Sequence, residues 1–317
     1  MNEAAETPFH DGELELQERA GWREKLAKGA PRFIRDHMTD QHREFFAQLP
    51  FVAVGMLDAH ARPWAGLLAG PPGFMSTPDA RHLEIRAEFP PSNSMASMVK
   101  EGANVGLLGI EFPTRRRNRA NGVIENVVPG GLRVRVEQAF GNCPQYIAAH
   151  DLEFRPATAF AAAAESQRLS QAAIGSIRAA STLFIASAAQ PHATDRREAC
   201  DVSHRGGDAG FVLVEDDPPR TRLWIPDYRG NNFFNTFGNI LRHPRAGLAF
   251  PDFVRGRVLM LTGAAEVVWE DSRRGLVFLA EAGCWERIAL GPRGLGREAG
   301  TVPPQRGDRG TRRPLSS

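Results

Sequence analysis

Short runs of apolar or alternating residues, rather than one long helical period, dominate the pattern of this chain. Gly, Pro, Asn and Asp separate these runs, as is typical of short strands joined by turns. The runs are 51–57, 64–69, 83–87, 104–110, 120–128, 132–138, 182–187, 199–203, 211–215, 222–225, 246–250 and 257–268. In 132–138 apolar and polar residues alternate with a period of two, so one face of that strand should be exposed to solvent. The pattern predicts a mainly β (α+β) fold of the barrel or sandwich type.

Helical patterns flank the strands. Residues 12–28 predict an amphipathic helix, and Thr39-Asp40 is a capping pair for a helix that stops at Pro50. Residues 151–165 read as a linker passing into a helix that reaches about Ala180. A last helix is predicted from about Asn232 to Arg242, and its asparagines are poor interior residues but good caps and ligand-binding groups.

The two strand-rich blocks can be aligned with each other. Gly122 to Val128 matches Gly263 to Trp269 at an offset of 141 residues (263 minus 122), and the same offset places Gly106 on Gly247. The pairs 73–74 and 210–211 are both Gly-Phe, and the segment before Gly106 occupies the slot of the Asn-rich helix. Four matches in one order indicate a tandem duplication.

This alignment predicts the organisation of the chain. The expected parts are an N-terminal helical extension (1–38), a first block (39–150), a linker and helix (151–180), a second block (181–290) and a disordered Gly/Arg/Pro-rich tail (291–317). The second block shows no strand equivalent to 132–138, because 273–290 read as a short helix or an irregular segment. Such an open edge recruits partners, so we expect its completion by the N-terminal region or by a second chain, as a homodimer or an intrachain pseudo-dimer.

Composition narrows the class of partner. The chain has 317 residues, room for two domains, and 39 Lys+Arg against 37 Asp+Glu give a net charge of +2. This balance gives no reason to expect nucleic acid or an anionic membrane, so the expected partner is a small molecule. Without a spanning apolar run or a signal-peptide pattern, we expect a cytoplasmic protein. Three scattered cysteines and nine scattered histidines indicate neither a disulfide framework nor a metal site.

Three polar clusters and one helix start are the candidates for chemistry. The run 115–122 (RRRNRANG) leads into a strand, so Arg117 and Arg119 would share one face and could meet a phosphate or carboxylate, unless that face is merely solvated. The other two clusters are 140–147 (FGNCPQYI) and 200–207 (CDVSHRGG). The helix start at Asn231 and Asn232, with Arg229 beside it, suits a phosphate, although these asparagines could simply cap the helix. The sequence has no G-x-S-x-G nucleophile elbow of a hydrolase, no G-x-G-x-x-G dinucleotide-binding loop and no Walker loop. A flat heterocycle that carries a phosphate is the ligand that fits the remaining clusters best.

These clusters, together with 40–51 (DQHREFFAQLPF), 62–74 (RPWAGLLAGPPGF) and 225–250 (IPDYRGNNFFNTFGNILRHPRAGLAF), resemble a known family. Over about residues 9 to 270 the chain is similar to two-block bacterial flavin-nucleotide-binding proteins related to pyridoxamine 5'-phosphate oxidase. The resemblance implies tandem FMN-binding split β-barrels of antiparallel Greek-key type with short flanking helices. FMN would lie at the junction of the barrels, and the second block would supply most of its site.

The resemblance also implies positions for the cofactor. Ser203, His204 and Arg205 would line the isoalloxazine, Ile225, Pro226 and Asp227 would flank the ring or ribityl chain, and Asn232, Asn235 and Thr236 would lie near the phosphate. In the oxidase the positions that align with Asn235 and Thr236 are basic. The charge is therefore expected here from Arg205, Arg229, or Arg117 and Arg119.

The expected function is that of an FMN-dependent oxidoreductase that transfers hydride or electrons to a small unidentified substrate. The oxidase's substrate-binding residues are not recognisable, so vitamin B6 oxidation is not implied, and no residue is assigned a catalytic role. The alternative is a non-catalytic flavin-binding or haem-binding carrier or sensing protein, in which His204 would be the natural haem ligand.

Overall fold

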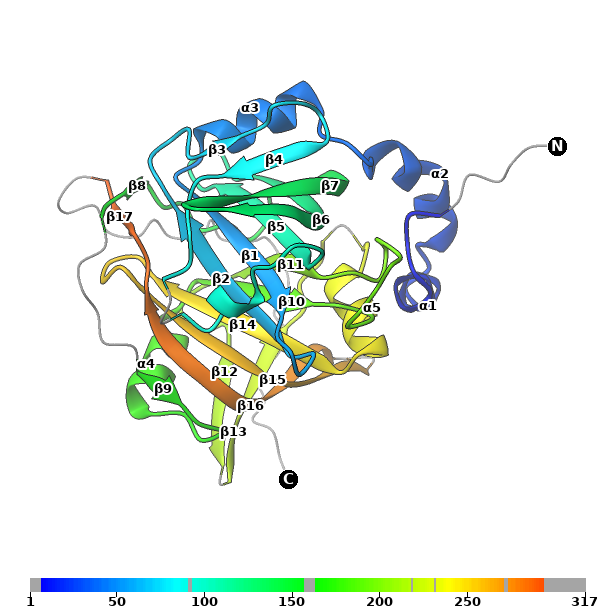
Figure 1. Cartoon of the computed structure of the whole chain (residues 1–317). Coiled ribbons are helices and arrows are strands. Elements are labelled where there is room, and N and C mark those ends of the chain that lie inside the picture. The colour runs from blue at the N-terminus through cyan, green and yellow to red at the C-terminus, as the bar shows by residue number, and fades with distance from the viewer. Residues whose placement is uncertain are drawn as a thin grey trace.

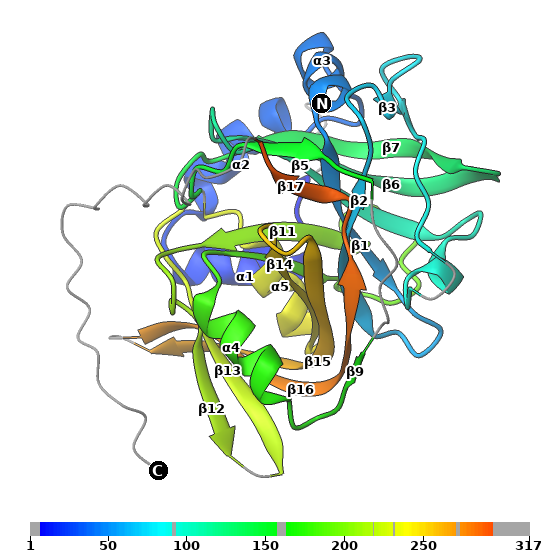
Figure 2. The ribbon, with the colours of Figure 1, turned by 90° about the vertical axis from the view of Figure 1, so that its left-hand side faces the viewer.

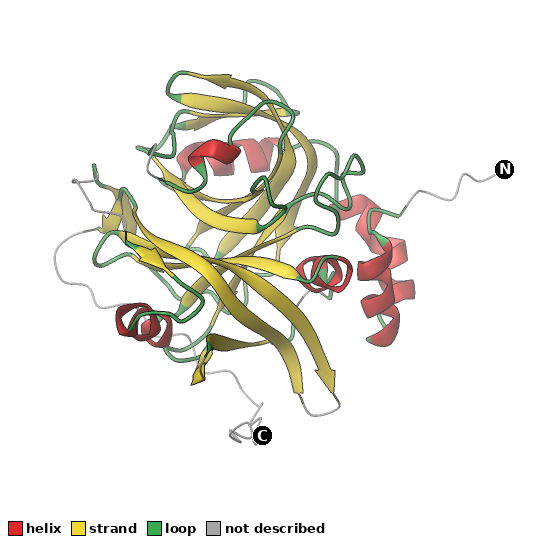
Figure 3. Ribbon diagram, turned by 60° about the horizontal axis from the view of Figure 1, so that its bottom comes forward, coloured by secondary structure: helices red, strands yellow, loops and turns green. Residues whose placement is uncertain are grey.

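Two antiparallel β-sheets lie against each other in this computed structural model, with helices around their outside (Figures 1 and 3). The structure describes residues 7–90, 93–156, 163–217, 219–230, 232–270 and 273–293. Within these residues each sheet is an open path of strands, and neither closes into a barrel. The fold is therefore mainly β, as the sequence predicts.

The first sheet has the order β2-β1-β5-β6-β7-β4-β3. Its strands are β1 (Phe51–Leu57), β2 (Pro63–Ala69), β3 (Met75–Ser76), β4 (His82–Ile85), β5 (Asn104–Glu111), β6 (Arg116–Val128) and β7 (Gly131–Asn142). The second sheet has the order β11-β10-β14-β15-β16-β13-β12. Its strands are β10 (Thr182–Ser187), β11 (Asp201–Gly206), β12 (Leu213–Asp217), β13 (Arg220–Pro226), β14 (Arg245–Asp252), β15 (Arg257–Glu270) and β16 (Arg273–Arg287). Each of these seven strands of the second sheet thus has a counterpart in the same place of the first.

The sequence matches between the blocks fall on counterpart strands. Gly122 on β6 and Gly263 on β15 both follow a break in strand register, a β-bulge. A Cβ at either glycine would overlap a carbonyl oxygen of the neighbouring strand, that of Arg135 or of Leu279. Glycine is needed at both bulges for the same steric reason, which accounts for the match at 141 residues.

Close approach of the two sheets depends on a second pair of matched glycines. A Cβ on Gly106 of β5 would lie 2.8 Å from the backbone of Asp201 on β11, and one on Gly247 of β14 would lie 2.5 Å from the carbonyl oxygen of Pro63 on β2. Strand β5 therefore packs on β11 as β14 packs on β2. The first half of the molecule is built on the sheet that contains β1 to β7, and the second half on the sheet that contains β10 to β16. The two halves face each other with approximate two-fold symmetry, and Phe51 and Phe184 pack edge to face across the junction.

Helices and short strands complete the fold. The helices are α1 (Asp11–Arg19), α2 (Arg23–Phe33), α3 (Asp40–Gln48), the 3-10 helix η1 (Ala96–Met98), α4 (Gln171–Ala179) and α5 (Asn235–Arg242). Helix α3 begins as predicted, since the Thr39 hydroxyl accepts from the His42 backbone N–H. Strand β9 (Ala164–Glu165) pairs with β16, and β8 (Leu152–Phe154) pairs with β17 (Leu290–Pro292), as Figure 2 shows. No helix among the described residues is long and apolar enough to cross a membrane.

The prediction that 273–290 form a helix or an irregular segment was wrong. Residues 273–287 form β16, which pairs with β15 over almost its whole length and with β13 on its other side. Its Ala, Leu and Glu content favours a helix locally, but strand pairing and burial override that preference. The second sheet therefore has its last strand, and the reason for expecting another segment or a second chain at this edge falls away.

Other boundaries also differ from the predictions. The helix expected at 12–28 is two helices separated at Gly21, whose φ of 71° interrupts a helix. The helix expected up to Ala180 starts only at Gln171, after β8 and β9. The tail was expected to start at residue 291, yet Gly291 and Pro292 belong to β17, and the rest of the predicted disordered tail, 294–317, lies outside the described residues.

Candidate functional site

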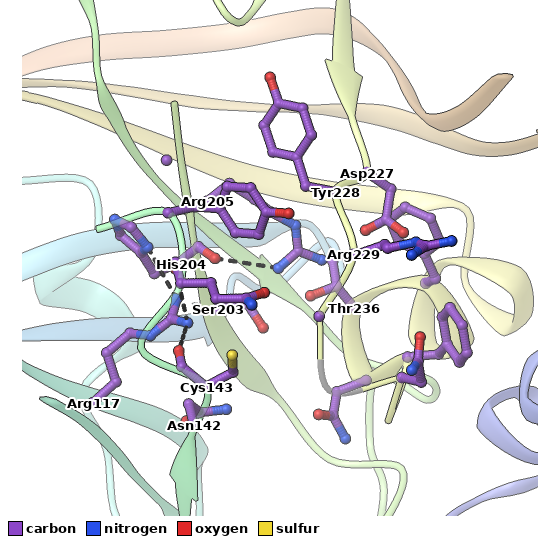
Figure 4. Close-up of a pocket in the computed structure, with 18 of the residues that line it drawn as sticks. Arg117, Asn142, Cys143, Ser203, His204, Arg205, Asp227, Tyr228, Arg229 and Thr236 are labelled. Carbon is purple, nitrogen blue, oxygen red and sulfur yellow. Dashed lines mark hydrogen bonds between the residues drawn. The ribbon is translucent and has the colours of Figure 1, made fainter. Parts of the chain in front are cut away.

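A pocket opens at the junction of the two halves (Figure 4). The space between its atoms is about 840 Å³, open solvent at its mouth included. The first half contributes Leu108 of β5, two arginines of β6 and the segment after β7. The second half contributes β11, the segment between β13 and α5, the first turn of α5 and Arg274 of β16.

Most residues expected at a cofactor site meet in this pocket. Its lining includes Arg117, Arg119, Ser203, His204, Arg205, Asp227, Arg229, Asn232, Asn235 and Thr236. Ile225 and Pro226 do not line it. The Ile225 side chain lies in the core of the second half, and Pro226 ends β13 opposite Gly275. Asn231, part of the expected phosphate site, lies outside the described residues.

The lining carries more positive than negative charge. Five arginines line the pocket, namely Arg117, Arg119, Arg205, Arg229 and Arg274. Two have carboxylate partners: Arg119 lies 2.9 Å from Asp201, and Arg274 lies 2.7 Å from Asp227. Within the described part of the chain the other three have no ion pair. Three guanidinium groups without a direct ion pair in one hollow favour an anionic ligand.

Arg119 joins three elements behind the pocket wall. Its side chain is 3% exposed. One terminal nitrogen donates to Asp201 Oδ2 at 2.9 Å and to Asn235 Oδ1 at 3.1 Å, and the other donates to Ser203 Oγ at 2.7 Å. This guanidinium therefore fixes β11 and the start of α5 to β6, so its role is at least partly structural.

Arg117 fixes the protonation state of His204. It donates to His204 Nδ1 at 3.0 Å, and because guanidinium can only donate, Nδ1 must be the acceptor and the ring proton lies on Nε2. Burial first, and then the cations Arg117 and Arg205, hold the pKa of His204 well below its ordinary value. Arg117 also donates to the carbonyl of Cys143, which holds the segment after β7 at the mouth of the pocket. His204 is therefore a neutral, fixed ring.

The start of α5 offers unused hydrogen-bond donors. The helix was predicted from Asn232 but begins at Asn235, because Asn232 and Phe234 have left-handed backbones with φ of 58° and 62°. Phe234 at the N-cap provides no side-chain cap. Thr236, 2% exposed, has a hydroxyl without a partner in the described residues. Helix N–H groups and a hydroxyl that have no partner among the described residues, at the lining of a basic pocket, form a site for an anion such as phosphate.

An aromatic pair lies at the pocket. The chain has only two tyrosines, and they stack on each other there: the rings of Tyr146 and Tyr228 are 4.8 Å apart and inclined by 18°. Tyr146 has a φ of 61°, so three strained non-glycine residues, with Asn232 and Phe234, line this pocket. Backbone strain of this kind collects at functional sites. The paired rings provide a flat surface that suits a planar ligand.

The sequence missed two of these features. Tyr228 adjoins Asp227 in the segment already singled out, and the rarity of tyrosine in the chain was a usable signal. Arg274 had no such signal, because its segment read as a helix and only the pairing of β16 with β13 brings it to Asp227.

The counterpart of this pocket in the other half is filled. Strand register makes Ser203, His204 and Arg205 of β11 equivalent to Gly66, Leu67 and Leu68 of β2, because each pairs with the matching residue of β10 or β1. The offset of 141 residues relates Arg117 to Val258, Arg119 to Met260 and Thr236 to Met95. Every polar group named here therefore has an apolar or glycine counterpart.

Side chains pack where the counterpart pocket would be. A Cβ on Gly66 would lie 2.5 Å from Met95 Sδ, 3.4 Å from Phe89 and 3.5 Å from Met260. All three side chains are buried in the hydrophobic core that includes the first sheet. Among the described residues, the polar site in one half thus has an apolar, filled counterpart in the other.

Comparisons with known proteins add little. No family model matches the chain, and neither does any curated protein. One similar solved structure is described as a "putative pyridoxamine 5'-phosphate oxidase" from Lactobacillus delbrueckii, with 18% identity, a TM-score of 0.27 and coverage of 33% of this chain and 94% of that one. Another is the Bacillus subtilis inhibitor of motility, with 7% identity, a TM-score of 0.23 and coverage of 76% and 88%. Both likenesses are too weak to assign a fold family or an activity.

Proposed function

We propose that this chain binds FMN in the pocket between its halves, as a tandem split-barrel flavoprotein related to pyridoxamine 5'-phosphate oxidase. One observation carries the proposal: an uncapped helix start and three arginines without ion pairs share one pocket with a flat aromatic pair. Such a pocket selects a ligand with an anionic group and a planar ring. The sequence resemblance supplies FMN as the ligand of that description.

The residues present fit a phosphate. Among the described residues, the N–H groups of the first turn of α5 have no side-chain cap and the Thr236 hydroxyl has no partner, so they could donate to phosphate oxygens. Arg229 lines the same pocket without a carboxylate partner in the described chain and would balance the charge. Asn235 and Thr236, in place of the basic residues of the oxidase, therefore do not remove the anion site.

The pocket also fits a flat heterocycle. Strand β11 is the edge strand of its sheet, so part of its backbone between Ser203 and Gly206 has no partner strand and can hydrogen-bond a ring edge. Tyr146 and Tyr228 would pack on the ring. Bound FMN would supply hydride or electron transfer. The chain would orient the ring, exclude water and provide a positive group, Arg205 or Arg117, to stabilise the reduced flavin.

His204 is a poor haem ligand in this fold. Its Nδ1 accepts from Arg117, and its ring lies among the aromatic rings of Phe112 and Phe184. Its Nε2 is buried without a partner in the described residues. Haem ligation would require breaking the Arg117 bond or repacking these rings, so the geometry favours flavin over haem.

Two measurements test the proposal. Reconstitution with FMN or FAD, followed by release of the cofactor and mass analysis, should recover FMN. Recovery of FAD, or of no flavin, would refute the assignment. Anaerobic addition of NADH or NADPH to the reconstituted protein then separates the two classes of function: bleaching of the flavin supports an oxidoreductase, and unchanged flavin with both donors supports a carrier or sensor.

A further inference from the structure

Helix α1 lies against the candidate anion site, although the sequence predicted only a flanking extension there. Figure 1 shows α1 beside α5. The contact is close: a Cβ on Gly12 would lie 2.5 Å from the Gly238 carbonyl oxygen, and one on Gly238 would lie 2.7 Å from the Glu13 side chain. Arg242 of α5 completes it through Asp11 and Glu15, each at 2.9 Å.

Glu13 carries this contact into the pocket wall. Its carboxylate accepts from the Asn235 side-chain amide and, at 2.9 Å, from the His10 backbone N–H. Asn235 lines the pocket and accepts from Arg119 through its other side-chain atom. Glu13 therefore contacts Asn235, and Asn235 contacts Arg119. Through these contacts Glu13 helps to position both Asn235 and Arg119, which line the pocket.

We propose that Glu13 is a positioning residue of the ligand site, and that a phosphate binds best when Glu13 is protonated. The proposal rests on the proposed phosphate site at the start of α5. Arg119 already pairs with Asp201, so neutral Glu13 leaves this group of three uncharged overall. Ionised Glu13 would give the group a net negative charge. Only Asn235 would separate Glu13 from the bound anion, so this charge opposes binding.

The surroundings of Glu13 shift its ionisation into the pH range in which binding can be measured. Its side chain is buried, and burial raises its pKa to about 8, against the lowering effects of the His10 N–H, Asn235 and Arg119. The titratable and charged groups around it are His10 and Asp11 on its own segment, Arg242 on α5, Arg119 on β6, Asp201 on β11, and Arg197, which lines the same small cavity.

The test is the pH dependence of affinity between pH 7 and pH 9, measured by flavin fluorescence with the full-length protein. If binding requires protonated Glu13, the Kd for FMN should rise about tenfold over this range. Glu13→Gln keeps an acceptor for Asn235 without a charge and should show no such rise. Glu18→Gln, an exposed carboxylate of α1 whose ion pair is with Arg23 and not with α5, is the matched control and should behave as wild type. Riboflavin, which lacks the phosphate, should bind independently of pH in all three proteins.

A second variant tests positioning rather than charge. Glu13→Ala leaves Asn235 without its acceptor and should weaken FMN binding about tenfold at pH 7, whereas Glu13→Gln should restore it. Thermal unfolding of each apo-protein checks that it is folded. An equal pH slope in wild type and Glu13→Gln, or undiminished FMN binding by a folded Glu13→Ala, would overturn the proposal.

Sulfate binding provides a test of the proposal that does not depend on flavin. Its charge is constant over this pH range, so its stabilisation of the wild-type protein, relative to chloride at equal ionic strength, should fall between pH 7 and pH 9 and stay constant in Glu13→Gln. If FMN does not bind but sulfate behaves in this way, the cofactor assignment fails and the role of Glu13 stands. If sulfate stabilises both proteins equally at every pH, the role of Glu13 fails.

Discussion

Replacing Arg205 by alanine separates ligand binding from folding. Arg205 lines the pocket, and its one hydrogen bond within the described structure runs from its guanidinium to the His204 carbonyl oxygen at 3.2 Å. A guanidinium has five N–H donors, so most of them are available to a ligand. Phe237 lies under the group at 5.9 Å, a weak cation–π contact. Asp227 also attracts this guanidinium, but the direct ion pair of Asp227 is with Arg274. The Arg205 side chain therefore contributes little to the fold of the apo-protein.

The expected magnitude follows from these contacts. Loss of a charged hydrogen bond to the cofactor should weaken FMN binding by about 1.5–3 kcal/mol, or about 10-fold to 150-fold in Kd. The free energy of unfolding of the apo-protein should change by less than about 0.5 kcal/mol. Arg119→Ala is the contrast, because it leaves Asp201 buried without its ion pair and should destabilise the apo-protein by about 3–5 kcal/mol.

Fluorescence titration with FMN and urea unfolding of the apo-protein measure the two quantities. If Arg205→Ala lowers apo stability as much as it lowers affinity, Arg205 is structural and the reasoning from its free donors is wrong. If Arg119→Ala leaves apo stability unchanged, the buried network does not hold the halves together as the contacts indicate.

Three further outcomes are expected. Calorimetric titration should give one FMN per chain, because Met95 and Met260 fill the counterpart pocket, and two per chain would contradict that packing. The folded-state pKa of Glu13, about 8, lies above its ordinary value of 4.5, so its contribution to the free energy of unfolding is complete below about pH 4.5 and is lost as pH rises to about 8. Urea unfolding across this range should show that loss in wild type and a smaller one in Glu13→Gln; equal slopes would mean that another group titrates. Removing 294–317 should leave FMN affinity unchanged, since the pocket lining described here ends at Arg274; loss of binding by a folded truncation would place the tail in the site.

Local chemistry made much of the strand pattern readable from the sequence. Strands such as Phe51–Leu57 and Thr182–Ser187 fall where the apolar runs predicted them, because alternation and bounding turn residues are local properties. The matched glycines were also readable. Gly106 and Gly247, like Gly122 and Gly263, occupy positions where a neighbouring backbone excludes any Cβ, and that steric demand leaves the same residue in both blocks.

The site was only partly readable from the sequence. Sequence clusters predicted most of the pocket lining, because arginines, asparagines and a Ser-His-Arg run are unusual within strands. Their meeting in one pocket depends on the packing of β11 on β5, which joins Arg119 to Ser203, 84 residues away. The role of Glu13 was invisible, since nothing in an ordinary amphipathic helix shows which carboxylate will be buried against Asn235.

By itself, then, the sequence determined the strand texture, the equivalence of the two blocks and the residue types available for an anion. Tertiary structure alone decided that 273–287 is a strand despite its helical composition, because cross-strand pairing outweighs local propensity. It also decided which of two equivalent positions is a pocket. Thr236 and Met95 occupy matching places in the two blocks, yet only the packed side chains around each show that one leaves a polar hollow and the other fills it.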